Sequence, residues 1–125
     1  MQVGGNTTNH GDNTFNHWMT TNAAYGIYYT TYKYLQLHPE QGLVAQNDEA
    51  LPFGGKFDLH DDWNSPHRTH DWGTAADIRG NGGSYAIPSV NQQEFINYCR
   101  DFQAIETLIE GPGTSNQHIH CRWAF

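Results

Sequence analysis

Apolar residues alternate with polar ones over residues 117–125 of this chain. A period of two is typical of a half-buried strand, and its apolar face would carry Ile119, Cys121, Trp123 and Phe125. His118 and His120 then share the other face, with Cα atoms roughly 6.5 Å apart. Two imidazoles at this spacing can both reach one small site. A pair of surface histidines fits the same alternation.

A second short strand is predicted at residues 74–79. Its apolar side would carry Thr74, Ala76 and Ile78, whereas the opposite side would carry Ala75, Asp77 and Arg79. His70 lies one tight turn earlier, and Gly73 lets the chain bend so that the His70 imidazole and the Asp77 carboxylate converge. A solvated or capping carboxylate is the alternative interpretation of Asp77.

Two helices are expected. The first runs from a cap at residues 20–22 to Leu37, and its apolar stripe would consist of Ala24, Ile27, Tyr28, Thr31 and Leu35. Its Tyr and Thr content would also suit a strand. The second helix begins at Ser89 or Asn91, because Ser89 and Gln92 have the spacing of a capping box. Its apolar stripe would consist of Phe95, Cys99 and Phe102.

Further strands are expected at residues 43–46, 85–87 and 104–110, with a turn at 111–113. No internal repeat and no linker between domains interrupts this series. The sequence therefore predicts an α+β domain, with helices on one face of a small antiparallel sheet and the candidate site on the other.

Composition limits the possible functions. A chain of 125 residues forms one domain, predicted at 17–125 after a flexible, Gly-, Asn- and Thr-rich lead-in at 1–16. The formal net charge of −7 argues against binding of nucleic acid, whose phosphates need a surface of Lys and Arg. No run approaches the roughly 18 apolar residues of a membrane span, and the first residues lack the features of a signal peptide.

One segment resembles a known motif. Residues 70–78, which read HDWGTAADI, are similar to the His-x-x-Gly-x-x-x-Asp-Ile signature of the zinc peptidases that group lysostaphin, D-Ala-D-Ala metallopeptidases and the hedgehog signalling domain. That group pairs the signature with a downstream His-x-His, as in His118-Ile119-His120 here. Residues 51–58 and 66–70 also resemble penicillin-insensitive murein endopeptidases. The likeness covers roughly residues 43 to 125.

The resemblance implies a zinc metallopeptidase with a hedgehog/D-Ala-D-Ala peptidase-like fold. It implies that His70, Asp77 and His120 bind Zn²⁺ and that His118 is the unligated catalytic base. Such a site lowers the pKa of a zinc-bound water to about 7. The implied substrate is an amide bond in peptidoglycan peptides, and the implied location is periplasmic or extracellular. A non-catalytic zinc-containing binding or signalling domain of the hedgehog type is the alternative.

Two departures disfavour carboxypeptidase activity. Many carboxypeptidases of the group carry Ser where this chain has Arg68, and Glu where it has His118. His67 and Arg68 themselves could orient a ligand or contact substrate, or lie in a surface loop. Acidic residues in the same stretch could accept hydrogen bonds, bind a cation or be solvated; they are Asp58, Asp61, Asp62 and Asp71. Trp63 and Trp72 could line a cleft or pack in the core.

The two cysteines are predicted to enter the core. Cys99 lies on the apolar stripe of the second helix, and Cys121 lies on the apolar face of the last strand. A disulfide and two buried thiols both fit this placement. Neither residue is expected to bind zinc, because Cys121 faces away from His118 and His120.

Overall fold

The computed structural model describes residues 19–46 and 73–125. Within them the chain forms α1 (Thr21–Leu37), the short 3-10 helix η1 (Pro39–Gln41), β1 (Ala75–Arg79), α2 (Ser89–Asp101), β2 (Glu106–Glu110) and β3 (His118–Arg122). None of the helices formed by these residues has the length and apolar character needed to span a membrane.

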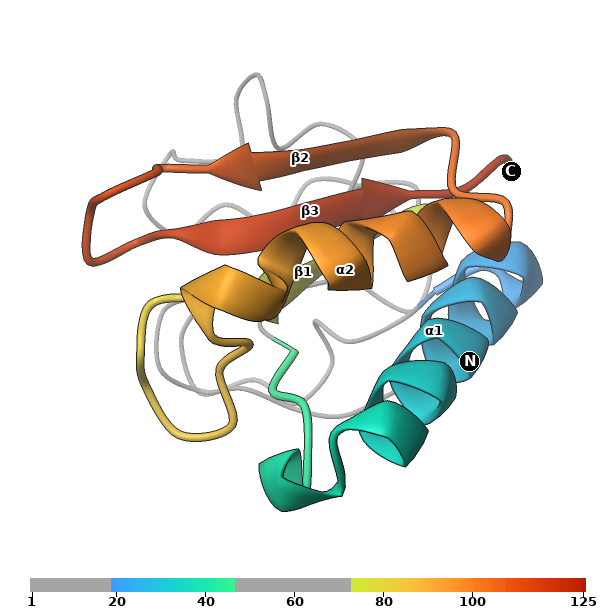
Figure 1. Cartoon of the computed structure of the whole chain (residues 1–125). Helices are drawn as coiled ribbons and strands as arrows, with labels where there is room; N and C mark the ends of the chain where they lie inside the picture. The colour runs from blue at the N-terminus through green and yellow to red at the C-terminus, as the bar shows by residue number, and fades with distance from the viewer. Residues whose placement is uncertain (1–18, 47–72) are drawn as a thin grey trace, which may run out of the picture.

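The three strands form one antiparallel sheet in the order β1-β3-β2. The last strand of the chain is therefore the middle strand of the sheet, and Figure 1 shows α2 lying across it. The strands predicted at 74–79, 104–110 and 117–125 correspond to β1, β2 and β3. The α+β class and the antiparallel sheet are confirmed.

The hydrophobic core lies between the sheet and the two helices. Ile78, Ile119 and Cys121 face this side and are fully buried together with Ile27 of α1 and Phe95 of α2. Because side chains alternate along a strand, the polar residues between them lie on the opposite face. The predicted separation of an apolar face under the helices from a polar face is confirmed. Phe125 lies beyond the end of β3 and is 86% exposed, so its predicted place on the apolar face is wrong.

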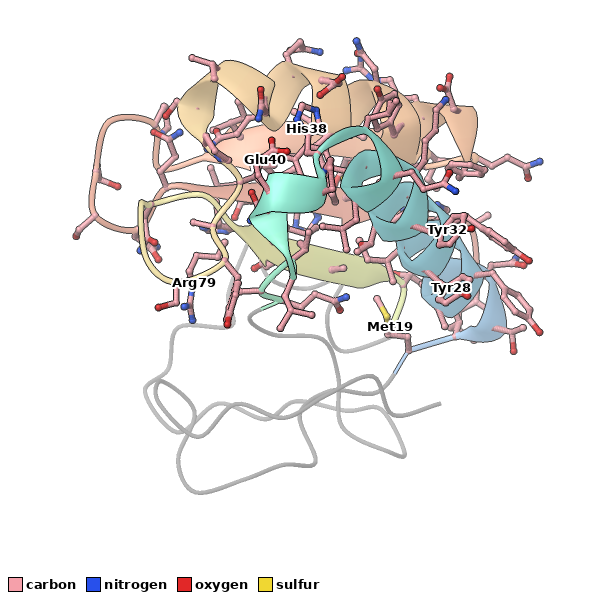
Figure 2. All side chains as sticks on the ribbon, turned by 60° about the horizontal axis from the view of Figure 1, so that its bottom comes forward. Met19, Tyr28, Tyr32, His38, Glu40 and Arg79 are labelled. Carbon is pink, nitrogen blue, oxygen red and sulfur yellow. The ribbon has the colours of Figure 1, made fainter. Side chains whose placement is uncertain are left out.

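Helix α1 begins and ends where the sequence predicts. The Thr20 side chain accepts a hydrogen bond from the Ala23 amide, and the helix ends before His38 and Pro39. Its buried stripe differs in phase from the prediction and consists of Ala23, Ala24, Gly26, Ile27, Thr30 and Tyr34. Tyr34 packs edge-on against Phe95, which turns Tyr28 and Tyr32 outward (Figure 2).

Helix α2 begins at Ser89, but the predicted capping box is wrong. Pro88 is the N-cap residue and no side chain caps the helix. The Gln92 side chain is buried and donates instead to the carbonyl oxygens of Gly80 and Ile87. These bonds fix the preceding loop to the helix.

Two predicted strands do not form as such. Residues 85–87 are irregular, because Tyr85 has a positive φ of 59° that no strand allows. Residues 43–46 form only an isolated bridge, between Gln46 and Ile78, and the Ala45 backbone is bonded to Arg79 and Tyr85. The turn predicted at 111–113 is present, and Gly111 and Gly113 supply its positive φ angles.

Candidate metal centre

The polar face of the sheet gathers five acidic or histidine side chains from three strands. Asp77 comes from β1, Glu106 and Glu110 from β2, and His118 and His120 from β3. The register places Asp77 directly opposite His120, and Glu110 directly opposite His118. Residues opposite each other in an antiparallel sheet have Cβ atoms about 4.5–5.5 Å apart. Each histidine of the middle strand therefore lies opposite a carboxylate of a flanking strand.

Asp77 and His120 form a buried pair. The His120 Nδ1 atom donates to the Asp77 Oδ1 atom over 2.9 Å, although the two residues are 43 positions apart. Their exposed fractions are 4% and 2%. Two ligand atoms of one tetrahedral zinc are about 3.3 Å apart, given bonds of about 2.0–2.1 Å. The Nδ1 and Oδ1 atoms are therefore close to the separation of neighbouring metal ligands.

His118 donates hydrogen bonds from both ring nitrogens. Its Nδ1 atom lies 2.7 Å from the Asn116 carbonyl oxygen, and its Nε2 atom lies 2.8 Å from Glu110 Oε2. The same Nε2 atom is 3.4 Å from Asp77 Oδ2. Because all these partners are acceptors, this geometry requires the charged imidazolium form.

The neighbouring carboxylates of Glu110 and Asp77 stabilise the charged form of His118. Burial alone would lower the pKa of His118, but the hydrogen bond to Glu110 and the negative charge of Asp77 outweigh it and raise the pKa to about 9. The hydrogen bond from His118 in turn lowers the pKa of Glu110. The sheet therefore carries a buried cation between two carboxylates.

Three of these residues can bind a metal ion together. One ligand atom each of Asp77, Glu110 and His118 lies within 4.8 Å of the others, and the side chains are buried or nearly so. Carboxylate oxygens and an imidazole nitrogen are a donor set that suits zinc and related divalent ions. On metal binding the imidazole would have to release a proton, because only its neutral form is a ligand.

Three of the residues singled out in the sequence meet at this site. Asp77, His118 and His120 share the polar face as predicted. Both histidines are buried, so their interpretation as a surface pair is wrong. The predicted ligand His70 lies outside the described residues, as do His67 and Arg68. The acidic residues 58–71 and the tryptophans Trp63 and Trp72 also lie outside them.

Glu110 and Glu106 were not anticipated. They lie on a strand that the sequence does predict. Glu106, Leu108 and Glu110 are alternate residues of this strand, so the two glutamates share one face. The Glu106 Oε1 atom lies 3.5 Å from His120 Nε2, and its Oε2 atom is 3.3 Å from Arg122. Pairing the predicted strands 104–110 and 117–125 through their connecting turn would have brought both glutamates beside the histidines.

The cysteines lie on the other side of the sheet from this site. Cys121 is fully buried in the core with Cys99 of α2. The expectation that both enter the core is confirmed.

The chain was compared with protein family models, with curated proteins and with solved structures, and none of them gave a significant match.

Proposed function

We propose that this protein is a zinc-dependent metallopeptidase that hydrolyses an amide bond, with peptidoglycan peptides as its substrate class. The observation that carries the proposal is the buried Asp77–His120 pair, with the His118 ring beside it. The similarity of residues 70–78 and of His118-x-His120 to zinc peptidases supports the same chemistry. Enzymatic use also explains a third buried ionisable side chain, the His118 ring, next to a pair of potential ligands.

In this proposal His70, Asp77 and His120 hold the zinc ion. Zinc at such a site supplies a Lewis acid and lowers the pKa of a water molecule to about 7. Asp77 and His120 are well suited as ligands because the sheet fixes both side chains at adjacent register positions. Little conformational freedom then remains to be lost when the ion binds.

His118 is the proposed general base. It would accept a proton from the attacking water, stabilise the developing oxyanion in its charged form, and deliver the proton to the leaving amine. This role requires a neutral ring at the start of the cycle. A divalent cation next to Asp77 favours the neutral ring, because it adds positive charge beside His118 and occupies the carboxylate.

Glu110 is proposed as the positioning residue for His118. Its carboxylate accepts the bond from Nε2, while the Asn116 carbonyl oxygen accepts the bond from Nδ1. In the neutral ring Nδ1 would keep its bond to the Asn116 carbonyl oxygen, and Nε2 would be the atom that accepts the proton from water. Glu110 also belongs to an alternative set of metal ligands, Asp77, Glu110 and His118. A substitution of Glu110 therefore distinguishes this set from the proposed set of His70, Asp77 and His120.

The test is a measurement of zinc content and hydrolysis on the same samples. The chain is stripped with chelator, reloaded with zinc, dialysed and assayed by elemental mass spectrometry. It is then incubated with purified peptidoglycan, and new amine and carboxyl ends are identified by mass spectrometry. Asp77→Ala and His120→Ala should lose both zinc and cleavage. His118→Ala should keep zinc and lose about 10²–10⁴-fold in turnover. Glu110→Gln should also keep zinc.

His38→Ala is the matched control. His38 is a partly buried histidine that bonds to Glu94 and Glu40 just after the end of α1. Figure 2 labels His38 and Glu40 side by side. Its removal should change neither zinc content nor cleavage. Full zinc binding by Asp77→Ala would disprove the ligand assignment. Loss of zinc in Glu110→Gln but not in His120→Ala would establish the alternative ligand set. Zinc-loaded protein that cleaves nothing would indicate a non-catalytic binding domain.

A further inference from the structure

Two cysteines on different elements face each other in the core. Cys99 lies on the buried side of α2, and Cys121 lies on the buried side of β3. Both are fully buried, and their Sγ atoms are 2.6 Å apart. Non-bonded carbon atoms are most stable roughly 3.5–4.0 Å apart, and sulfur atoms are larger. Two separate thiols would therefore be forced apart from this position.

The surroundings of Cys121 disfavour a catalytic or metal-binding role for its thiol. Burial, followed by the neighbouring Cys99 sulfur, raises the pKa of the Cys121 thiol well above its ordinary value. The thiolate is the form that attacks a substrate or binds a metal, and the apolar core disfavours it. The polar face with Asp77, His118 and His120 lies on the opposite side of the sheet from Cys121.

We propose that Cys99 and Cys121 are oxidised to a disulfide that fastens α2 to β3. Each thiol loses its hydrogen, one sulfur–sulfur bond forms, and two electrons and two protons pass to an oxidising disulfide. Oxidised glutathione or the active-site disulfide of an oxidoreductase is such an acceptor, and it leaves as two thiols. The exchange takes place during folding, before α2 packs on the sheet, because the folded core excludes the oxidant from both sulfur atoms.

The bond has a consequence for the polar face. It joins positions 22 residues apart, and the loop between them contains all of β2 and most of β3. Glu106, Glu110, His118 and His120 therefore lie inside one covalently closed loop. The bond restricts the unfolded chain over the segment that carries four of the five acidic and histidine residues of the polar face. This inference does not depend on the proposed function.

Intact mass and thiol labelling test the bond without any substitution. The chain is refolded with a mixture of reduced and oxidised glutathione, then denatured without reductant and treated with a maleimide. We expect no label and a mass lower by two hydrogen atoms than that of the reduced chain. Prior reduction in denaturant should give two labels, and the product should be a monomer on a non-reducing gel. Two labels without reduction, or a disulfide-linked dimer, would overturn the proposal.

Thermal melting measures what the bond contributes. A sample reduced in denaturant and refolded with reductant should melt lower than the oxidised sample, by on the order of 10 °C for a loop of this length. The double variant Cys99→Ala/Cys121→Val should melt at one temperature in both conditions. Equal melting of oxidised and reduced wild-type protein would show that the bond does not fasten α2 to β3.

Discussion

The His118 ring links the stability of the metal-free protein to pH. Its charged form lies between Asp77 and Glu110, and its pKa is raised to about 9 from an ordinary value near 6.5. A group whose pKa is raised by folding stabilises the folded state fully below the unfolded pKa. That contribution is then lost as the pH rises through the folded pKa.

We therefore expect chelator-treated protein to lose stability between about pH 6.5 and pH 9. The expected loss is about 3 kcal/mol from this group, because one pKa unit corresponds to about 1.4 kcal/mol. Urea denaturation at pH 6 and pH 9.5 measures it. His118→Gln should remove most of this pH dependence. The remainder would come from His38, whose pKa is raised by its bond to Glu94. Equal pH dependence in wild type and His118→Gln would contradict the assignment.

Single residues of the site could be predicted where a strand's own alternation decides the outcome. The alternation predicts the polar face for Asp77, His118 and His120. Their neighbours Ile78, Ile119 and Cys121 are apolar and take the other face. Glu110 needs a further step, since its role depends on which strand lies beside β2. The alternation within β2 does not name that neighbour, and only the pairing of β2 with β3 across the turn at 111–113 supplies it.

At the scale of elements, α1 packs closely against Trp123, the residue that follows β3. A Cβ atom added at Gly26 would lie 2.1 Å from Nε1 of Trp123. The indole is 2% exposed and is held by a hydrogen bond from Nε1 to the Phe102 carbonyl oxygen. A shift of the ring away from the helix would break this hydrogen bond.

Gly26→Ala should therefore destabilise the protein, although alanine favours a helix by about 1 kcal/mol over glycine. Overpacking at such a contact costs roughly 1–3 kcal/mol or more. Trp123→Leu removes the indole, so Gly26→Ala should become neutral or stabilising in that background. Urea denaturation of both single variants and the double variant gives the coupling between the two sites. Additive effects would show that Gly26 is not packed against the Trp123 ring.

The elements also show where local sequence is a poor guide. Both helices were predicted because apolar residues recur at helical spacing and Thr20 and Pro39 mark the ends of the first. The buried face of α1 differs from the predicted face, because Tyr34 rather than Tyr28 packs against Phe95. A tyrosine suits both a buried and an exposed position, so a helix rich in tyrosine does not specify its own buried face.

At the scale of the whole molecule, a metal ion that binds only the folded chain should add to its stability. The proposed ligands come from separate parts of the sequence, and the unfolded chain does not hold them together. Binding at a ligand concentration about 1,000 times the Kd contributes about 4 kcal/mol. Zinc-loaded protein should therefore melt several degrees higher than chelator-treated protein in a calorimetric scan.

Asp77→Ala is the control for this prediction. It removes the carboxylate that faces both His118 and His120, so its melting temperature should not respond to zinc or chelator. A variant that is stabilised by zinc as strongly as the wild type would place the ion elsewhere in the molecule.

The order of the strands also bears on how the protein is made. A ribosome releases β1 and β2 before β3, yet β3 is the only one of the three that pairs with both others. Until it emerges, β1 and β2 have no partner within this sheet, and Asp77 is still 43 residues from the histidine it pairs with. Folding of the sheet, and with it assembly of the proposed ligands Asp77 and His120, must therefore follow synthesis of residues 118–122.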